Sequence, residues 1–225
     1  MASINKTGLH IVIILLCLLP FAYLASIYPM LAEQVPTHFN LENQPDDYSS
    51  KQALWLITSL LALVAIGLYF LLRNIHHLDP KRIGQSESGT FNKLALGMAI
   101  FLTALNFLTL ASTAGHFDSL QETSFVLLGA LFVFLGNYMH SIKPNYFAGF
   151  RLPWTLSDEE NWRLTHRLGG RVWVGGGLLI AIGGIVLSEK PMMILFISTV
   201  VVLILVPLVY SLMLFRKKQK LQRQG

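Results

Sequence analysis

The sequence ALWLITSLLALVAIGLYFLL, residues 53–72, decides the fold class, because it is a long apolar run without a charged residue. As a helix rising about 1.5 Å per residue, this run is long enough to cross the hydrocarbon core of a bilayer, which is about 30 Å thick. Lys51 precedes the run and Arg73 follows it, and such residues anchor a span at the membrane surface. The run therefore predicts a transmembrane helix.

Further apolar blocks extend this prediction to the whole chain. Of the 225 residues, 53% are hydrophobic and 13% are charged, with a mean hydropathy of +0.55, whereas a soluble domain carries about 25% charged residues. No alternating apolar pattern of the kind found in membrane β-strands is present. The sequence predicts an all-α integral membrane protein with six transmembrane helices. The other spans are expected over residues 9–31, 94–111, 125–139, 172–187 and 192–215.

The basic residues predict the orientation. All Lys and Arg residues except Lys51 and Lys190 fall on the segments that share one side of the membrane with the two termini. Because basic residues near span ends resist translocation, we predict that both termini are cytoplasmic. The net charge of +5 is explained by these loops, so the bilayer is the expected partner and no direct nucleic-acid binding is predicted.

Two non-membrane segments are longer than a simple connection requires. The outer one, residues 32–50, reads AEQVPTHFNLENQPDDYSS, and its prolines and Asn43 predict a shaped loop with a turn. His38, Asn40 and the nearby carboxylates could surround a cation, but their spacing matches no known set of ligands. We therefore predict no metal site and no cofactor.

The inner segment, residues 142–171, reads IKPNYFAGFRLPWTLSDEENWRLTHRLGGR and begins as a constrained turn. Ser157 and Glu160 have the spacing of a capping box, which predicts a short interfacial cytoplasmic helix before the fifth span. We expect this helix to cover residues 158–168 and to end at the double glycine that follows.

The spacing of Trp162, Thr165 and His166 places them on one face of that helix. Two interpretations remain open: the aromatic residues anchor the helix at the lipid head groups, or the face docks a cytoplasmic protein or a lipid. Glu160 and His166 do not share a face, and no nucleophile completes a catalytic set with them. The sequence therefore predicts that the protein is not an enzyme.

Glycines recur at intervals of seven residues in and before the fifth span, which we interpret as one stripe for close helix packing. The contact is expected within the bundle rather than across a dimer. The members of the stripe are Gly169, Gly176 and Gly183, with Gly170, Gly177 and Gly184 beside them.

Asn106 and Asn137 lie in apolar blocks, where an amide is costly unless it is paired. We expect the two to pair with each other or with Thr103 and Thr109. No charged residue lies well inside a span, which argues against an ion-coupled pump.

The stretch GNYMHSIKPNYFAGFRLPWTLSDEENWRLTHRLGGRVWVGGGL, residues 136–178, closely resembles the signature of the SdpI family of bacterial membrane immunity proteins. Phe150 and Leu152 depart from the Ile and Thr expected there, which bears on partner specificity. The outer stretch VPTHFNLENQPDDYSSK, residues 35–51, is similar to the N-terminal module commonly found with this family.

The resemblance implies three parts. Residues 1–75 form an N-terminal membrane module of two spans, residues 91–216 form an SdpI-like module of four spans, and residues 217–225 form a basic cytoplasmic tail. It also implies a multi-pass location in the bacterial inner (plasma) membrane.

The resemblance further implies immunity to a secreted killing peptide, together with signalling that recruits a cytoplasmic repressor. A peptide, lipid or small-molecule transporter and a lipid-modifying enzyme are the alternatives. The candidates for ligand or partner binding are His38, Asn40, Asn137, Lys143, Asn145, Arg151, Trp154, Glu160, Trp162, Arg163, His166 and Arg167.

Overall fold

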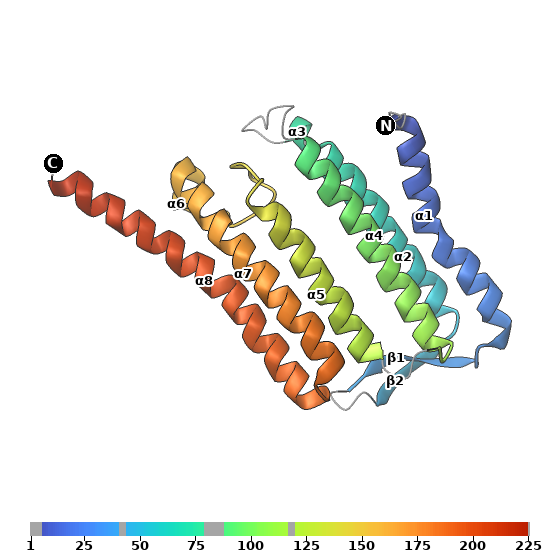
Figure 1. Cartoon of the computed structure of the whole chain (residues 1–225). Helices are drawn as coiled ribbons and strands as arrows, with labels where there is room; N and C mark the ends of the chain where they lie inside the picture. Colours follow the sequence, from blue (N-terminus) through green and yellow to red (C-terminus); the bar gives the residue numbers. More distant parts are fainter. Residues whose placement is uncertain (1–5, 41–43, 79–87, 117–119, 225) are drawn as a thin grey trace.

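The computed structural model describes residues 6–40, 44–78, 88–116 and 120–224. In this part of the chain, 6 helices are long and apolar enough to cross a membrane, which confirms the predicted fold class (Figure 1). These helices are α1 (Lys6–Ile27), α2 (Ala53–Arg73), α4 (Ser88–Thr113), α5 (Leu120–Met139), α7 (Glu159–Val186) and α8 (Glu189–Gln224). The shorter elements are η1 (Tyr28–Met30), β1 (Gln34–Phe39), β2 (Pro45–Ser50), α3 (Ile75–Leu78) and α6 (Pro153–Ser157).

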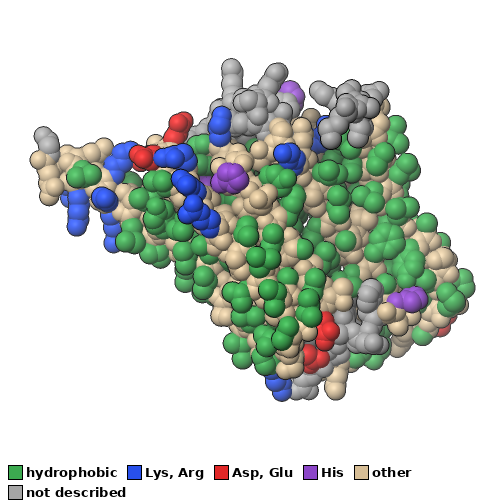
Figure 2. Space-filling view, in the orientation of Figure 1, with side chains coloured by type: hydrophobic (Ala, Val, Ile, Leu, Met, Phe, Trp, Pro, Cys, Tyr) green, Lys and Arg blue, Asp and Glu red, His purple; other side chains and the backbone are tan. Residues whose placement is uncertain are grey.

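The long helices expose large apolar side chains on their outer faces, as a membrane protein does. Leu63 on α2 is 68% exposed and Ile185 on α7 is 71% exposed. Figure 2 shows hydrophobic side chains over the flank of the molecule, with many of the Lys and Arg side chains gathered near one end. The outer surface of the helices is therefore suited to the hydrocarbon core of a bilayer.

The helices form two packed groups that meet in the middle of the molecule. α1, α2 and α4 pack together, and α5 packs extensively against α7, which also contacts α8. Contacts between α4 and α5 join the groups. Both termini lie at one end and the β1–β2 hairpin lies at the other (Figure 1). The side of the membrane that each end faces remains a prediction.

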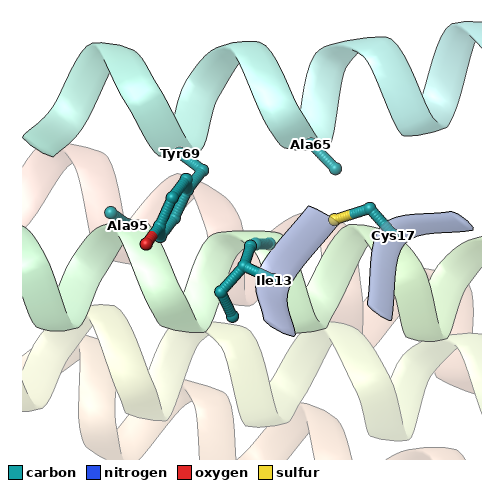
Figure 3. Close-up of a cluster of buried hydrophobic side chains, with 6 residues drawn as sticks. Ile13, Cys17, Ala65, Tyr69 and Ala95 are labelled. Atoms are coloured by element: carbon teal, nitrogen blue, oxygen red, sulfur yellow. The ribbon is translucent and has the colours of Figure 1, made fainter. Parts of the chain in front are cut away.

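Small side chains allow close packing in the first group. Ala65 on α2 and Ala95 on α4 lie in one buried cluster with Ile13 and Cys17 of α1 (Figure 3). Tyr69 belongs to the same cluster, and its hydroxyl accepts a hydrogen bond from Arg73 Nη1 at 3.1 Å. The polar end of the tyrosine is thus satisfied at the edge of an apolar core.

The outer segment is an antiparallel hairpin, a more regular structure than the predicted shaped loop. Gln34 pairs with Ser50 and Phe39 with Pro45, with register irregularities near His38. The turn predicted at Asn43 lies outside the described residues. Each strand contains a proline, which is tolerated here because the sheet has only two strands and so only edges.

The predicted division at residues 75 and 91 stays a prediction. α4, which opens the predicted second module, packs against α1 and α2 as well as against α5. Residues 217–224 of the predicted basic tail continue α8 as a helix.

Candidate functional site

The inner segment between α5 and α7 contains a short helix, as predicted, but its bounds differ. The short helix is α6 (Pro153–Ser157), whereas the predicted range 158–168 is the first part of α7. α7 continues unbroken through the double glycine, because both glycines serve packing: a Cβ on Gly170 would lie 2.7 Å from the Gly136 carbonyl oxygen. The prediction that the helix ends at these glycines was therefore wrong.

The predicted capping box of Ser157 and Glu160 is replaced by a cap one residue later. Asp158 is the N-cap of α7, and its carboxylate accepts hydrogen bonds from the backbone N–H groups of Glu160 at 3.1 Å and Asn161 at 3.3 Å. Ser157 is still inside α6, so its hydroxyl bonds back to the Trp154 carbonyl at 3.4 Å. A carboxylate suits this position because it also meets the positive end of the helix dipole.

Asn145 holds the first turn of the inner segment in one conformation. Its side chain is fully buried and makes four hydrogen bonds. The amide oxygen accepts from the backbone N–H groups of Phe147 and Ala148, and the amide nitrogen donates to the carbonyls of Lys143 and Ala148. The side chain therefore replaces secondary structure as the source of order in this turn.

His166 is a structural contact between this turn and α7. Its Nε2 accepts a hydrogen bond from the Phe150 backbone N–H at 3.0 Å, so the ring proton lies on Nδ1, which donates to the Trp162 carbonyl at 2.8 Å. Gly149 has φ +106° and passes so close to the imidazole that a Cβ would collide with it. Only glycine meets both requirements at this position.

The face formed by Trp162, Thr165 and His166 is buried inside the protein, at 1%, 0% and 1% exposure. The Trp162 indole N–H donates to the Ile142 carbonyl at 2.7 Å, and its ring stacks on His166 with centroids 4.0 Å apart. This face therefore reaches neither the lipid head groups nor a partner, and both interpretations drawn from the sequence are corrected. Spacing revealed a shared face but not what covers it.

Polar contacts connect the inner segment to α8. The Trp154 indole N–H donates to Ser211 Oγ at 3.1 Å, and Asn161 Nδ2 donates to the Ser211 carbonyl at 2.9 Å. The Trp173 indole N–H donates to the Leu203 carbonyl at 3.1 Å. That carbonyl has no helical partner, because Pro207 four residues later lacks an N–H. α7 thus supplies the donor that the proline removes from α8.

An ion pair joins the start of α7 to the end of α8. Lys218 Nζ lies 2.8 Å from Asp158 Oδ2. The hydrogen bond from Lys218 is the main cause that holds the pKa of Asp158 below its ordinary value of 3.8; burial opposes it, and the backbone N–H groups of Asn161 and Glu160 add to it. The carboxylate therefore stays charged at neutral pH.

The α7 glycines form two stripes rather than the one predicted, and both confirm packing within the bundle. Gly176 and Gly183 face side chains of α8, including Leu203 and Leu195. The second stripe faces α5, where the backbones approach closely. Its members are Gly170, Gly177 and Gly184, opposite Gly136, Gly129 and Phe125. Helices can come this close in a membrane only where small residues remove the side-chain barrier.

Asn106 and Asn137 are not partners, contrary to the expectation. Asn106 is buried, and its Nδ2 donates to the Thr58 carbonyl of α2 at 3.2 Å. Thr103 and Thr109 instead bond to carbonyls of their own helix. Asn137 is exposed on α5. Sequence periodicity could not identify the partner, because Thr58 offers a backbone atom.

Three of the exposed candidates line a pocket between α5 and α7, with a volume of about 600 Å³. Asn137, Arg163 and Arg167 line it together with two residues that the sequence had not suggested, His140 and Arg171. The repeat of arginine at every fourth position on α7 was the signal that could have identified Arg171. Lys143, Arg151 and Glu160 are exposed nearby in sequence but do not line this pocket.

The outer candidates lie at the opposite end of the molecule (Figure 1). His38 Nδ1 lies 2.6 Å from Asp46 Oδ1, and both side chains are exposed on the hairpin. The Asn40 amide oxygen accepts from the Gln44 backbone N–H at 2.9 Å, which supports the end of β1. No group of three or more His, Cys, Asp and Glu residues within the described ranges is placed to hold a metal ion.

Comparison with known proteins finds similarity to one family over part of the chain. Residues 141–211 match the model of the SdpI/YfhL protein family, and residues 15–62 match a domain of unknown function, DUF1648. The chain is 29% identical over 201 residues to the protein named "Immunity protein SdpI" of Bacillus subtilis (strain 168). The aligned region covers 88% of this chain and 89% of that protein. No solved structure was found to match. These matches confirm the resemblance predicted from the sequence: the chain is similar to the SdpI/YfhL family over residues 141–211 and to DUF1648 over residues 15–62.

Proposed function

We propose that this protein gives a bacterial cell immunity to a secreted antimicrobial peptide. The observation that carries the proposal is the similarity to Immunity protein SdpI, which extends over both modules and 88% of the chain. The expected location is the inner membrane, where a membrane-active peptide would act.

We further propose that the two ends of the molecule have different tasks in immunity. The exposed hairpin around His38 would contact the peptide on the outer side. The inner segment would report that contact to a cytoplasmic repressor. Its Asn145-centred turn presents Tyr146 and Phe147, which are 47% and 38% exposed, in a fixed conformation suited to docking.

The contacts between α7 and α8 offer a route for the signal. Trp154 and Asn161 both bond to Ser211, so a shift of α8 against α7 would move the inner segment. A ligand can drive such a shift only if it binds one arrangement of the helices more tightly than the other.

The geometry favours neither alternative function. A transporter would use a polar path around Asn106 and Asn137, but Asn106 is buried between α2 and α4 while Asn137 lines the pocket beside α7. A lipid-modifying enzyme would use Glu160 with His166. His166 is buried with both ring nitrogens bonded, whereas Glu160 is exposed, with one carboxylate oxygen 3.8 Å from Arg163. We therefore propose a non-enzymatic role.

Immunity is tested by producing the protein in a peptide-sensitive bacterium. The minimum inhibitory concentration is then measured for peptides secreted by the organism from which the protein comes. We expect the parent to raise that concentration at least about fourfold for one peptide. His38→Ala should lose most of the protection at an unchanged membrane level, whereas Gln34→Ala, an exposed change on the same strand, should not. Equal sensitivity with and without the parent protein, across all peptides, would refute the proposal.

Signalling is tested separately by following which cytoplasmic proteins move to the membrane when the protective peptide is added. We expect one DNA-binding protein to move with the parent and to stay soluble with the double variant Tyr146→Ala and Phe147→Ala. Preserved protection with no peptide-dependent recruitment would reject signalling and leave immunity standing.

A further inference from the structure

The pocket between α5 and α7 is lined mainly by basic and other polar side chains and by glycines. Arg163, Arg167 and Arg171 line it from α7, Asn137 lines it from α5, and His140 lines it from the turn after α5. Because they are four residues apart, the arginines lie on one face of the helix and extend over about 12 Å of its axis. The pocket therefore presents a column of positive charge beside a helix–helix groove.

The structure provides little negative charge for this column. The carboxylate contacting Arg163 is that of Glu160 at 3.8 Å, between side chains that are 63% and 69% exposed. Within the described ranges, Arg167 and Arg171 have no ion-pair or hydrogen-bond partner. An arginine inside a membrane-spanning helix is costly without a partner, and this cost increases with depth.

The same face continues as an apolar strip that is open to the lipid. Gly175 follows Arg171 by one turn, and Leu178 and Ile182 extend the line at 50% and 61% exposure. A Cβ on Gly175 would meet nothing within 4 Å, unlike the packed glycines on either side of it. Helix packing therefore does not explain this glycine, which leaves open space beside the pocket that a flexible chain could fill.

We propose that this pocket binds an anionic phospholipid, with the phosphate between the arginines and an acyl chain along Gly175 and Leu178. Guanidinium groups bind phosphate oxygens in a bidentate manner, which suits the exposed column. Basic pockets between transmembrane helices are known sites for anionic head groups. This binding is independent of immunity and does not rest on it.

The test uses the full chain purified in a neutral detergent, titrated with phosphatidylglycerol, phosphatidylcholine or inorganic phosphate, with bound lipid counted by native mass spectrometry. We expect saturable binding of phosphatidylglycerol, at least tenfold weaker binding of phosphatidylcholine, and no competition by inorganic phosphate at millimolar concentration. Displacement of phosphatidylglycerol by millimolar inorganic phosphate would identify a free-anion site and overturn the proposal.

Matched variants separate a pocket from general surface charge. Arg167→Gln with Arg171→Gln should weaken phosphatidylglycerol binding at least tenfold. Arg216→Gln with Arg223→Gln removes the same charge from exposed positions on α8 outside the pocket and should change affinity less than twofold. Equal losses in the two double variants, or none in the first, would refute the site.

Gly175→Leu tests the acyl path without removing a charge. Because a Cβ has open space there, the variant should fold with a normal yield and melting temperature. We expect it to weaken phosphatidylglycerol binding at least threefold by filling the space proposed for the acyl chain. Unchanged binding in this folded variant would contradict the acyl path.

Discussion

Thr58 and Thr155 show how differently two buried threonines can be used. Both are 0% exposed. Thr155 Oγ1 donates toward the carbonyls of Phe150 and Leu152 and accepts from the Leu152 N–H. Thr58 Oγ1 has no hydrogen-bond partner among the residues that the structure describes. Burial alone therefore does not tell which hydroxyl stabilises the fold.

Replacement by valine, which has the same shape, should separate the two positions. Thr155→Val should lower the free energy of unfolding by about 1–3 kcal/mol, because buried backbone groups lose their partner. Thr58→Val should change the same free energy by less than about 0.5 kcal/mol. Unfolding in detergent by a denaturant series measures both. A larger loss in Thr58→Val than in Thr155→Val would contradict the hydrogen-bond assignment.

Single residues were the hardest feature to predict from the sequence. Ser157 and Asp158 are both good N-caps, and which one is used depends on the length of α6 before them. His166 was correctly placed on one face with Trp162, but its backbone partner, Phe150, lies in a loop whose path no periodicity encodes. Residue type indicates the capacity to bond, while the partner is decided by tertiary structure.

At the scale of elements, α7 serves as the shared packing partner of α5 and α8. Its two glycine stripes face the two neighbours. A seven-residue repeat on a straight helix drifts relative to its 3.6-residue turn, so a repeat held on both faces favours a gentle left-handed winding of the helices.

Adding one methyl group to α7 should test this packing at two nearby positions. Gly177→Ala places a Cβ 2.7 Å from the Gly129 carbonyl oxygen and the Val133 nitrogen and should cost about 1–3 kcal/mol. Gly175→Ala meets open space and should keep or raise stability, by up to about 1 kcal/mol. Melting temperatures in one detergent compare the pair. Similar melting temperatures in both variants would show that α5 does not pack as described.

The ion pair between Asp158 and Lys218 predicts how the end of α8 is held. Asp158→Asn keeps a good N-cap but removes the charge, so trypsin should cleave after Lys217 or Lys218 several-fold faster at neutral pH. Lys218→Gln tests the pair from the other side and should speed cleavage after Lys217. Cleavage at the parental rate in both variants would show that this ion pair does not hold the end of α8.

The same pair has a defined pH dependence. Because the pKa of Asp158 is lowered in the folded protein, its stabilising effect is complete above the ordinary value of 3.8 and is lost as the pH falls through the lowered folded-state pKa. Between pH 5 and pH 8 the contribution of this carboxylate should therefore stay constant. Melting temperatures of the parent and of Asp158→Asn should differ by a constant amount over that range.

The sequence predicted the membrane-spanning helices better than the other elements, because the bilayer restricts which segments can span it. All spans were identified, because the apolar length needed to cross a membrane leaves few alternatives. The extent of α7 was missed, because glycines that end a helix in water can lie inside a packed helix in lipid. The hairpin was missed because its strands contain prolines and lack alternating apolar residues.

At the scale of the whole molecule, the structure places both termini, α3 and α6 at one end and the hairpin at the other (Figure 1). The distribution of Lys and Arg predicts that the first end is cytoplasmic. The structure alone does not choose between the two orientations, so the choice rests on the basic residues.

Cysteine labelling tests that orientation directly. On a background with the buried Cys17 replaced by alanine, Ser49→Cys in the hairpin should react with an impermeant thiol reagent in intact cells. Ser157→Cys, at the end of α6, should react only after the membrane is permeabilised. Labelling in the reverse pattern would invert the whole assignment.

The family signature predicted the candidate site only in part. It pointed to the inner segment, and the structure shows that many of its residues, such as Asn145 and Trp162, are buried and build the segment. The pocket is lined instead by residues of α5, α7 and the turn after α5, among them the exposed His140 and Arg171. A linear motif does not display which positions from separate helices meet on a surface.

The two glycine stripes of α7 also have a consequence for how the protein is inserted into the membrane during synthesis. A helix rich in glycine and arginine enters a bilayer reluctantly by itself, since glycine adds little apolar surface and arginine opposes insertion. α5 leaves the ribosome before α7, but α8 leaves after it. Until α8 is inserted, the stripe of α7 that packs against α8 therefore has no partner. We expect chains cut short before Glu189 to be recognised as incomplete and degraded, which makes the last helix a checkpoint for assembly.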